Sequence, residues 1–247
     1  APADTAEAIA HYQRRLQDYP QAPDTDRVLY QLARAQDLGT QPAAALATLD
    51  RLVRQHPDTA LRDEAQFRRG ELLFSARRWA DAEAAFAAVV ESPRPQPFTE
   101  RARYMQGWSQ FKQARLEPAL ASFMAVLDPH LGGRDPALPL EQLPGLSRAD
   151  RELVEDVLRV LGLTLENLQG AASIPPLIDR PLRAGYELRL YQRLSAMYLQ
   201  QDRPKDAADA LAAFLARHPL DAQAPWLQAR IAAIHAEAGF AQPAQAA

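Results

Sequence analysis

Residues 76–90 read ARRWADAEAAFAAVV, and residues 113–127 read QARLEPALASFMAVL. Both stretches place small, aromatic and aliphatic residues at the same spacing. The correspondence extends along the chain with a constant shift of 37 residues. The aligned columns are Ala8, Ala45, Ala82 and Ala119; Tyr12, Leu49, Phe86 and Phe123; Leu16, Val53, Val90 and Leu127; Tyr30, Phe67 and Tyr104; and Ala33, Gly70 and Gly107. A repeat of this length is typical of a solenoid built from one supersecondary unit.

The composition favours an all-helical chain. Of the 247 residues, 47% are hydrophobic and only 7% are aromatic, and alanine is prominent among the hydrophobic residues. Alanine is the best helix former, and β-branched residues never form the alternating runs that strands require. We therefore predict that the repeats consist of helices.

Each repeat is predicted to contain two helices joined by a short turn. In the second repeat the first helix is expected at residues 63–76, where Phe67, Gly70 and Phe74 fall on one face. Prolines mark the expected starts of second helices, because the N–H groups of a first turn have no helical partner; they are Pro42, Pro118 and Pro204. Second helices are expected to end at two His-Pro pairs, His56-Pro57 and His218-Pro219.

Small residues recur where the two helices of a repeat approach each other. A larger side chain at such a point pushes the helices apart, at a cost of roughly 1–3 kcal/mol. The predicted structural positions are Ala45, Gly70, Ala82, Gly107, Ala119 and Ala207.

The periodicity predicts a single solenoid over residues 1–247. Its complete units are expected at residues 26–57, 63–94, 100–129, 148–180 and 188–219, with half units at residues 5–20 and 222–240. Because both ends fall inside a unit, we expect a fragment of a longer chain or a domain with substituted caps.

One segment departs from the period. Residues 128–150 carry four prolines and three glycines and are predicted to form an irregular insert, of a length that is usually functional or mobile. Ser147 and Asp150 then resemble a helix N-terminus. Pro175-Pro176 requires the second half of the fourth unit to be short or kinked.

The fifth unit is the clearest and reads YQRLSAMYLQQDRPKDAADALAAFLARHP at residues 191–219. It resembles the tetratricopeptide repeat (TPR) family, whose spaced positions are occupied here by Tyr191, Leu194, Ser195, Tyr198, Ala207, Leu211, Phe214 and Pro219. The first three units match less closely, because their period is longer than the family's 34 residues. The resemblance implies an all-α, right-handed superhelical solenoid of TPR-like helix-turn-helix repeats that binds other proteins.

Residues 56–90, HPDTALRDEAQFRRGELLFSARRWADAEAAFAAVV, resemble units of bacterial cell-envelope TPR proteins. Similar units occur in the outer-membrane barrel-assembly lipoprotein and in the periplasmic TPR protein associated with the Tol–Pal system. This resemblance implies a periplasmic or outer-membrane-associated location. The cytoplasm is the alternative, because such repeats also occur there.

Charge and composition narrow the classes of partner. The net charge of −3 and the pI near 6.0 differ from the strongly basic balance of general nucleic-acid binders, so no nucleic-acid partner is predicted. No stretch approaches the roughly 20 apolar residues that span a bilayer, so direct membrane insertion of this segment is not expected. The absence of cysteine excludes disulfides and leaves the compartment open. Nothing in the sequence indicates the oligomeric state.

We predict no catalytic residue, cofactor or metal. The sequence contains no HExxH pair, glycine-rich phosphate loop or G-x-S-x-G elbow. Asp128, His130 and Asp135 match no standard ligand spacing. Glu152 and Asp156 lie near a helix start, where acidic residues commonly complement the helix dipole.

An aromatic column in the first helices is the candidate partner-binding groove. It consists of Tyr30, Phe67 and Tyr104, joined by Phe74, Trp108 and Phe111. Such rings either anchor a hydrophobic ligand segment or fill the core, because large aromatic side chains dominate both. Arg34 and Arg101 complete the candidate groove, where they could hold a carboxylate or instead pair with neighbouring glutamates.

The sequence therefore predicts a non-enzymatic protein–protein interaction scaffold. A peptide or partner protein is expected in the concave groove, within a bacterial cell-envelope assembly. Two alternatives remain: a ligand- or peptide-sensing regulatory module, and the positioning arm of an enzyme whose catalytic domain lies outside this segment.

Overall fold

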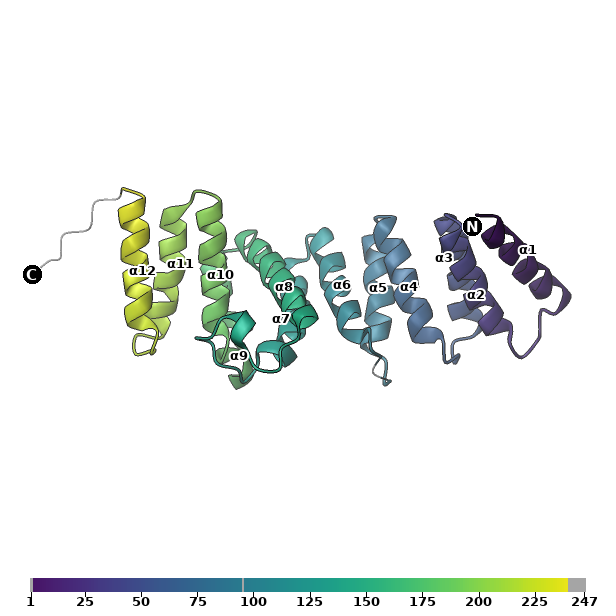
Figure 1. Cartoon of the computed structure of the whole chain (residues 1–247), viewed down its shortest axis with the longest axis horizontal. Coiled ribbons are helices and arrows are strands. Elements are labelled where there is room, and N and C mark those ends of the chain that lie inside the picture. The colour runs from purple at the N-terminus through teal and green to yellow at the C-terminus, as the bar shows by residue number, and fades with distance from the viewer. Residues whose placement is uncertain (1, 95, 240–247) are drawn as a thin grey trace, which may run out of the picture. The chain divides into compact units, whose positions relative to one another are not determined.

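The structure is a computed structural model that describes residues 2–94 and 96–239, with side chains described from Asp4 onward. These residues form helices, turns and irregular segments, and no strand occurs among them, which confirms the all-α prediction. The chain divides into two compact units, residues 1–115 and 116–247. Within each unit, successive long helices pack side by side (Figure 1).

The first unit contains the more regular repeats. Its described helices are α1 (Pro2–Asp18), α2 (Thr25–Leu38), α3 (Pro42–Gln55), α4 (Arg62–Ser75), α5 (Trp79–Val90) and α6 (Thr99–Lys112). The helices α2 and α3 form one hairpin, and α4 and α5 form the next. Pro42 begins α3, and α3 ends directly before His56, as predicted. The single helix α1 precedes the first hairpin and corresponds to the predicted half unit.

The turns inside the hairpins repeat one backbone geometry. Thr40, Arg77 and Ala114, which are spaced like the sequence columns, have φ values of 58°, 59° and 57°, and Asp202 has 57° in the second unit. In each turn the next residue's N–H donates to a carbonyl five residues back, as Arg78 N does to Leu73 O at 2.9 Å. This is the hydrogen bond of the Schellman motif, which satisfies carbonyls at the end of a helix. The 37-residue period is therefore present in the backbone as well as in the side chains.

The core of each hairpin follows the columns of small and large residues. Ala45, Ala82, Ala119 and Ala207 are fully buried, and Gly70 and Gly107 are buried as well. At Gly70 the free space is taken by the Phe86 ring: a Cβ atom there would lie 2.7–2.9 Å from three of its carbons. The glycine therefore makes room for a side chain of the paired helix, and burial of that ring contributes about 1.5–3 kcal/mol.

The second unit combines regular and irregular repeats. Its described helices are α7 (Leu116–Leu131), α8 (Arg148–Glu166), α9 (Pro181–Ala184), α10 (Glu187–Gln200), α11 (Pro204–Arg217) and α12 (Ala224–Glu237). Its 3₁₀ turns are η1 (Leu140–Gln142), η2 (Gly170–Ser173) and η3 (Pro175–Leu177). The helices α10 and α11 form the hairpin of the clearest repeat, and α12 packs on α11. The predicted last half unit extends to residue 240, which lies outside the described residues.

The insert begins later than predicted and is held in place. Helix α7 continues through Pro129 to Leu131, because the buried Leu131 side chain still packs in the unit. The following residues are irregular, but Leu143 and Leu146 are buried. Arg189 of α10 donates hydrogen bonds to the carbonyls of Asp135 and Leu138, at 2.8 and 2.7 Å.

The fourth repeat keeps its first helix and loses its second. Ser147 and Asp150 form a capping box at the start of α8, which confirms the predicted helix start. After α8 the chain forms η2, η3 and the four-residue α9, as the proline pair predicts. The missing second helix is replaced by a chain of short turns.

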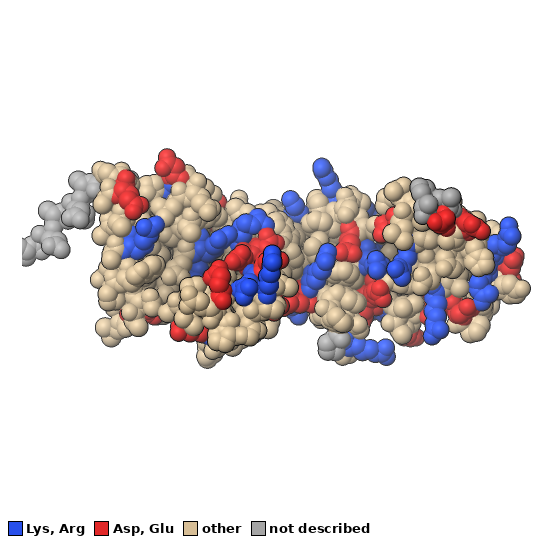
Figure 2. Space-filling view, in the orientation of Figure 1, with Lys and Arg blue, Asp and Glu red and all other residues tan. Residues whose placement is uncertain are grey.

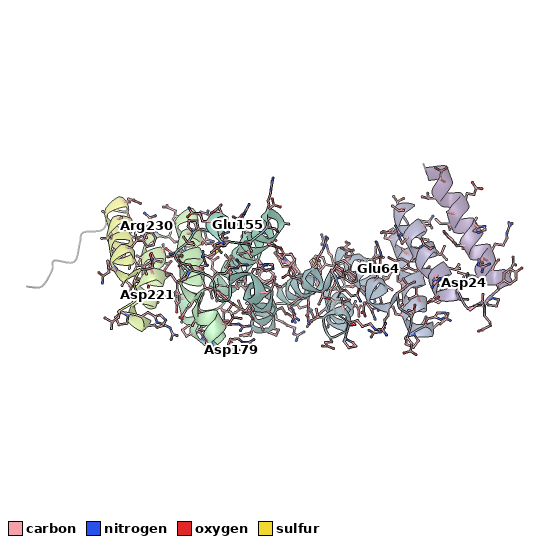
Figure 3. All side chains as sticks on the ribbon, turned by 60° about the horizontal axis from the view of Figure 1, so that its bottom comes forward. Asp24, Glu64, Glu155, Asp179, Asp221 and Arg230 are labelled. Carbon is pink, nitrogen blue, oxygen red and sulfur yellow. The ribbon has the colours of Figure 1, made fainter. Side chains whose placement is uncertain are left out.

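A polar cluster fastens these turns to α7. Arg183 of α9 donates from Nε and Nη2 to the two carboxylate oxygens of Asp128, each at 3.0 Å, and Tyr186 donates to the same carboxylate at 2.6 Å. The side chains of Arg183 and Asp128 are only 8% and 13% exposed. Arg183 also pairs with Asp179, whose position Figure 3 shows. Burial raises the pKa of the Tyr186 hydroxyl, which therefore remains a donor to Asp128.

Charged side chains of both signs are interspersed over the visible face of each unit (Figure 2). Among the described residues, no helix combines the length and the apolar character needed to cross a bilayer.

Candidate functional site

Phe67, the middle residue of the predicted aromatic column, lies in the core of the first unit. It is 9% exposed, and its ring packs against Phe86 at a centroid distance of 5.8 Å and against Phe98 at 5.1 Å. The guanidinium of Arg101 lies over the ring, 5.9 Å from its centroid. Arg101 also pairs with Glu71 at 3.2 Å. Of the two alternatives for this arginine, the structure shows the pair with a neighbouring glutamate.

Tyr30 is also buried, with 4% of its surface exposed. Its hydroxyl donates to Glu64 of the next hairpin and accepts a hydrogen bond from Arg68 Nε at 2.7 Å. Burial and the contact with Glu64 raise the pKa of Tyr30. Tyr30 therefore links adjacent hairpins inside the unit. Arg34 lies exposed on α2, the helix that also carries the buried Tyr30.

The remaining aromatic candidates form a partly exposed surface on α4, α5 and α6. We call it the aromatic face and define it by Phe74, Trp79, Tyr104, Trp108 and Phe111, all of intermediate burial. Neighbouring rings meet close to edge-to-face: Phe74 and Trp79 at 4.8 Å, Tyr104 and Trp108 at 6.4 Å, and Trp108 and Phe111 at 5.5 Å. This geometry is the favoured one for aromatic pairs.

The sequence places the members of the aromatic face for simple reasons. Tyr104, Trp108 and Phe111 recur at i, i+4 and i+7, which is one face of α6. Phe74 occupies the last turn of α4, and Trp79 is the first residue of α5. The tight turn at Arg77 brings Trp79 back against Phe74.

Sequence reasoning missed two residues at this site. The predicted groove consists of residues on first helices, and Trp79 belongs to a second helix. Lys112 was absent as well, yet its ammonium lies 5.8 Å from the Trp108 ring centroid and 6.0 Å from that of Trp79. The i,i+4 spacing of Trp108 and Lys112 was a usable signal. The proximity of Trp79 depends on the turn and on the packing of α5 against α6.

The residues considered for a metal site or an acid pair are engaged in other contacts. Asp128 is held by Arg183 and Tyr186, and an Asp135 carboxylate oxygen accepts from the Ala137 N–H at 2.8 Å. Within residues 2–94 and 96–239, no group of three or more acidic or histidine side chains is arranged to hold a metal ion.

The acid pair on α8 belongs to surface ion pairs. Glu152 pairs with Arg148 at 2.8 Å, and Asp156 pairs with Arg159.

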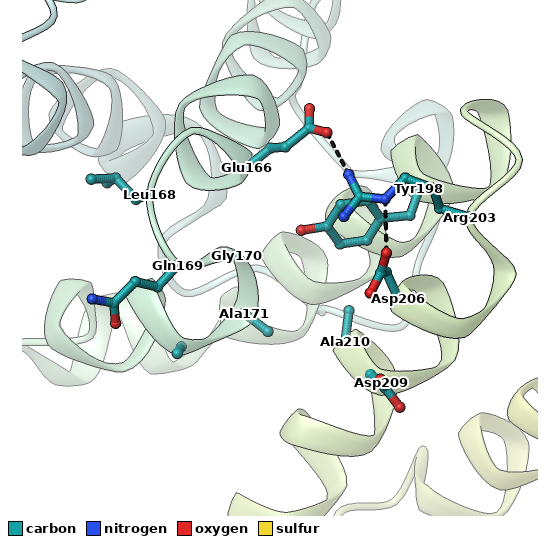
Figure 4. A pocket seen from close by; sticks show the side chains of 11 residues that line it. Glu166, Leu168, Gln169, Gly170, Ala171, Tyr198, Arg203, Asp206, Asp209 and Ala210 are labelled. Atoms are coloured by element: carbon teal, nitrogen blue, oxygen red, sulfur yellow. Dashed lines mark hydrogen bonds and ion pairs between the residues drawn. The ribbon is translucent and has the colours of Figure 1, made fainter.

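A polar cavity of about 350 Å³ lies in the second unit, between η2, α10 and α11 (Figure 4). Arg203 crosses it, donates to Glu166 and Asp206 at 2.7 Å each, and stacks on Tyr198 at 4.4 Å. The guanidinium of Arg203 at the centre of the cavity is therefore neutralised by Glu166 and Asp206. It is already paired and offers an acidic ligand no free cation.

The family model of the tetratricopeptide repeat matches residues 30–97, 67–136 and 198–238, which together cover more than half of the chain. The chain belongs to the tetratricopeptide repeat family. TPR repeats generally mediate protein–protein interactions, and TPR proteins are generally non-catalytic. No curated protein matches the sequence.

Several solved structures are similar to the chain. The crystal structure of MamA is 13% identical, with a TM-score of 0.45, and the match covers 76% of this chain and 95% of MamA. A double mutant, MamA RS-1 ArsTM, is 16% identical with a TM-score of 0.45, covering 82% of this chain and 99% of its own. A TPR protein from Parabacteroides merdae ATCC 43184 is 14% identical with a TM-score of 0.48, and the match covers 96% of this chain and 86% of that protein.

Proposed function

We propose that this TPR chain is a non-enzymatic scaffold that binds a peptide or partner protein through the aromatic face of α4, α5 and α6. The observation that carries the proposal is the partial exposure of five neighbouring rings. Other rings of the chain are fully buried, among them Phe86, Phe123 and Tyr186. Rigid aromatic side chains that remain accessible are the usual anchors of protein interfaces.

The location of the face supports a groove-like binding mode. Phe74, Tyr104, Trp108 and Phe111 all lie on first helices, the helices that were predicted to line the concave side of the solenoid. Arg101 extends this surface and is 67% exposed despite its pair with Glu71. A peptide that lies across α4 and α6 would thus contact rings at its centre and charges at its rim, which is the common anatomy of an interface.

The proposed setting is a bacterial cell-envelope assembly, periplasmic or associated with the outer membrane. Its support is the likeness of residues 56–90 to repeats of the barrel-assembly lipoprotein and of the Tol–Pal-associated protein. Fractionation of cells that express the complete gene product tests this setting. Recovery in the cytoplasmic fraction alone would overturn it.

Site-specific photo-crosslinking in the native cell tests the interaction surface. A benzophenone amino acid placed at Phe111 is expected to give a discrete crosslinked species, because the ring would lie against the partner. The same residue placed at Tyr19, an aromatic side chain that is 61% exposed on a different part of the unit, is the control. Equal crosslinking from both positions, or none from Phe111, would contradict the assignment of the face.

Truncation of a central ring gives the corresponding affinity measurement. Trp108→Ala is expected to weaken binding of the crosslinked partner by at least about 1 kcal/mol, because buried aromatic anchors dominate interface energies. Isothermal titration with the purified chain measures the change, and a circular dichroism melt establishes that the variant is folded.

A further inference from the structure

Lys112 occupies an unusual position at the edge of the aromatic face. It is the last residue of α6, and its exposed side chain places the ammonium near the rings of both Trp79 and Trp108. A cation within about 6 Å of a ring centroid is attracted by the negative face of the ring. Two such rings hold one flexible side chain at a defined point of the surface.

The charge of Lys112 has no carboxylate partner in the part of the chain that the structure describes. Two other cations of this region differ. Arg101 pairs with Glu71, and Arg115 pairs with Glu83 at 2.6 Å. The chain's second lysine, Lys205, pairs with Asp209 at 2.6 Å.

The sequence around Lys112 carries more positive than negative charge. Residues 101–115 carry four cationic side chains and neither aspartate nor glutamate. Glu71 and Glu83, from α4 and α5, neutralise the two arginines at the ends of this stretch. The rings stabilise the ammonium of Lys112 but do not neutralise it, so a positive charge remains beside an apolar surface.

We propose that Lys112 is a specificity-determining residue that selects a partner segment in which an acidic side chain lies next to apolar ones. The carboxylate would pair with the ammonium while the apolar neighbours contact Trp79 and Trp108. Charge complementarity carries the choice of partner: a cationic segment would bring a like charge against Lys112, which disfavours binding. This inference rests on the proposed function of the aromatic face and names the chemistry of its partner.

Selection from a random heptapeptide display library on the immobilised full chain tests the inference. We expect enrichment of sequences that combine Asp or Glu with neighbouring aromatic or aliphatic residues. Lys112→Gln is expected to keep the apolar preference and lose the acidic one, and Lys112→Glu to reverse it toward Lys and Arg. Lys205→Gln makes the same charge change in the other unit and should leave the selected sequences unchanged.

The outcomes separate this inference from the proposed function. Apolar peptides enriched without an acidic preference would leave the binding face standing and overturn the role of Lys112. Enrichment of basic peptides on the unsubstituted chain would likewise overturn it and indicate that the indoles receive a partner's cation. If no enriched peptide depends on Trp108 for binding, both the aromatic face as a binding surface and the role of Lys112 are refuted.

Affinities of one selected peptide complete the test. Changing its acidic residue to the matching amide should weaken binding to the unsubstituted chain roughly two- to fivefold, as expected for a partly exposed ion pair. The same change should have no effect on binding to Lys112→Gln, because the pair is already absent. The difference should shrink as salt is raised to about 1 M, where the screening length falls to about 3 Å.

Discussion

The hairpin of α4 and α5 and the segment from α8 to α9 each begin with the first helix of a repeat. They differ in what packs against that part of the fold in place of, or as, the second helix. In the hairpin, a buried ring, Phe86, fills the space that Gly70 leaves open. In the α8–α9 segment, the second helix is lost, and an arginine reaches back to the carboxylate of Asp128 instead. The first solution is local and apolar. The second is polar and joins residues 55 positions apart.

The comparison shows what each solution requires of the chain. An apolar hairpin tolerates changes in polar surface but depends on the match between a small residue and a ring. A buried ion pair tolerates irregular backbone but depends on both charges remaining together, because an unpaired buried charge is costly. Substitutions that remove one of these requirements at a time distinguish the apolar hairpin from the buried ion pair.

The largest effect is expected from Arg183→Ala. The substitution leaves the buried Asp128 carboxylate without its cation, and we expect a loss of roughly 3–5 kcal/mol in the free energy of unfolding. Urea denaturation followed by circular dichroism measures it. Arg180→Ala is the matched control: Arg180 approaches the same carboxylate at 3.9 Å but is 52% exposed, so its removal should cost at most about 1 kcal/mol. Equal losses would show that the Asp128 cluster is not a buried clasp.

An intermediate effect with opposite signs is expected from two glycine-to-alanine substitutions. Gly70→Ala places a methyl group against the enclosed Phe86 ring, and overpacking of this kind costs about 1–3 kcal/mol. Gly162→Ala on α8 meets Met197 Sδ at 3.5 Å and Arg193 Cγ at 3.9 Å, both ordinary contacts. There the better helix propensity of alanine should stabilise the chain by about 0.5–1 kcal/mol. Thermal melts of both variants check the signs.

A loss of stability in both glycine variants would break the comparison, because it would mean that α8 is packed as tightly as α4. A gain in both would mean that the Phe86 ring moves freely enough to admit a methyl group.

The regular part of the fold could be predicted from the sequence because its determinants are local and repeated. The columns of Ala82, Gly70 and Phe86 identify helices, turns and paired faces without knowledge of distant residues. Pro42 and the pair His56-Pro57 even bound α3 to the residue. The left-handed turn residues share the same period, although Thr40, Arg77 and Ala114 are three different residue types.

The irregular part and half of the candidate site could not be predicted, because they depend on contacts that no repeat encodes. Nothing in the sequence pairs Asp128 with Arg183. The end of α7 at Leu131 follows from burial rather than from the helix-breaking tendency of Pro129. The difference in burial between Phe67 and Trp108, both members of the predicted groove, also depends on tertiary packing. Lys112 acquires its position only when Trp79 folds back beside it.

The smallest effect concerns a polar contact between regular hairpins and depends on pH. Thr59 donates to the Asp26 carboxylate at 2.5 Å, and this hydrogen bond lowers the pKa of Asp26. A pKa below its unfolded value means that the contact stabilises the fold above the unfolded pKa and is lost as pH falls through the folded one. Thr59→Val should therefore cost about 1 kcal/mol near pH 7 and almost nothing near pH 2.

Thr25→Val provides the control, because the Thr25 hydroxyl donates to the Ala22 carbonyl at 2.7 Å and that acceptor does not titrate. Its cost should be the same at both pH values. Urea unfolding at each pH measures the two variants, and a Thr59→Val cost that persists in acid would show that the hydroxyl acts through packing rather than through the charge of Asp26. Because this contact is peripheral and Arg183 is enclosed, the ratio of the two losses measures how far burial, rather than the mere presence of an ionised partner, determines what a polar contact contributes to this fold.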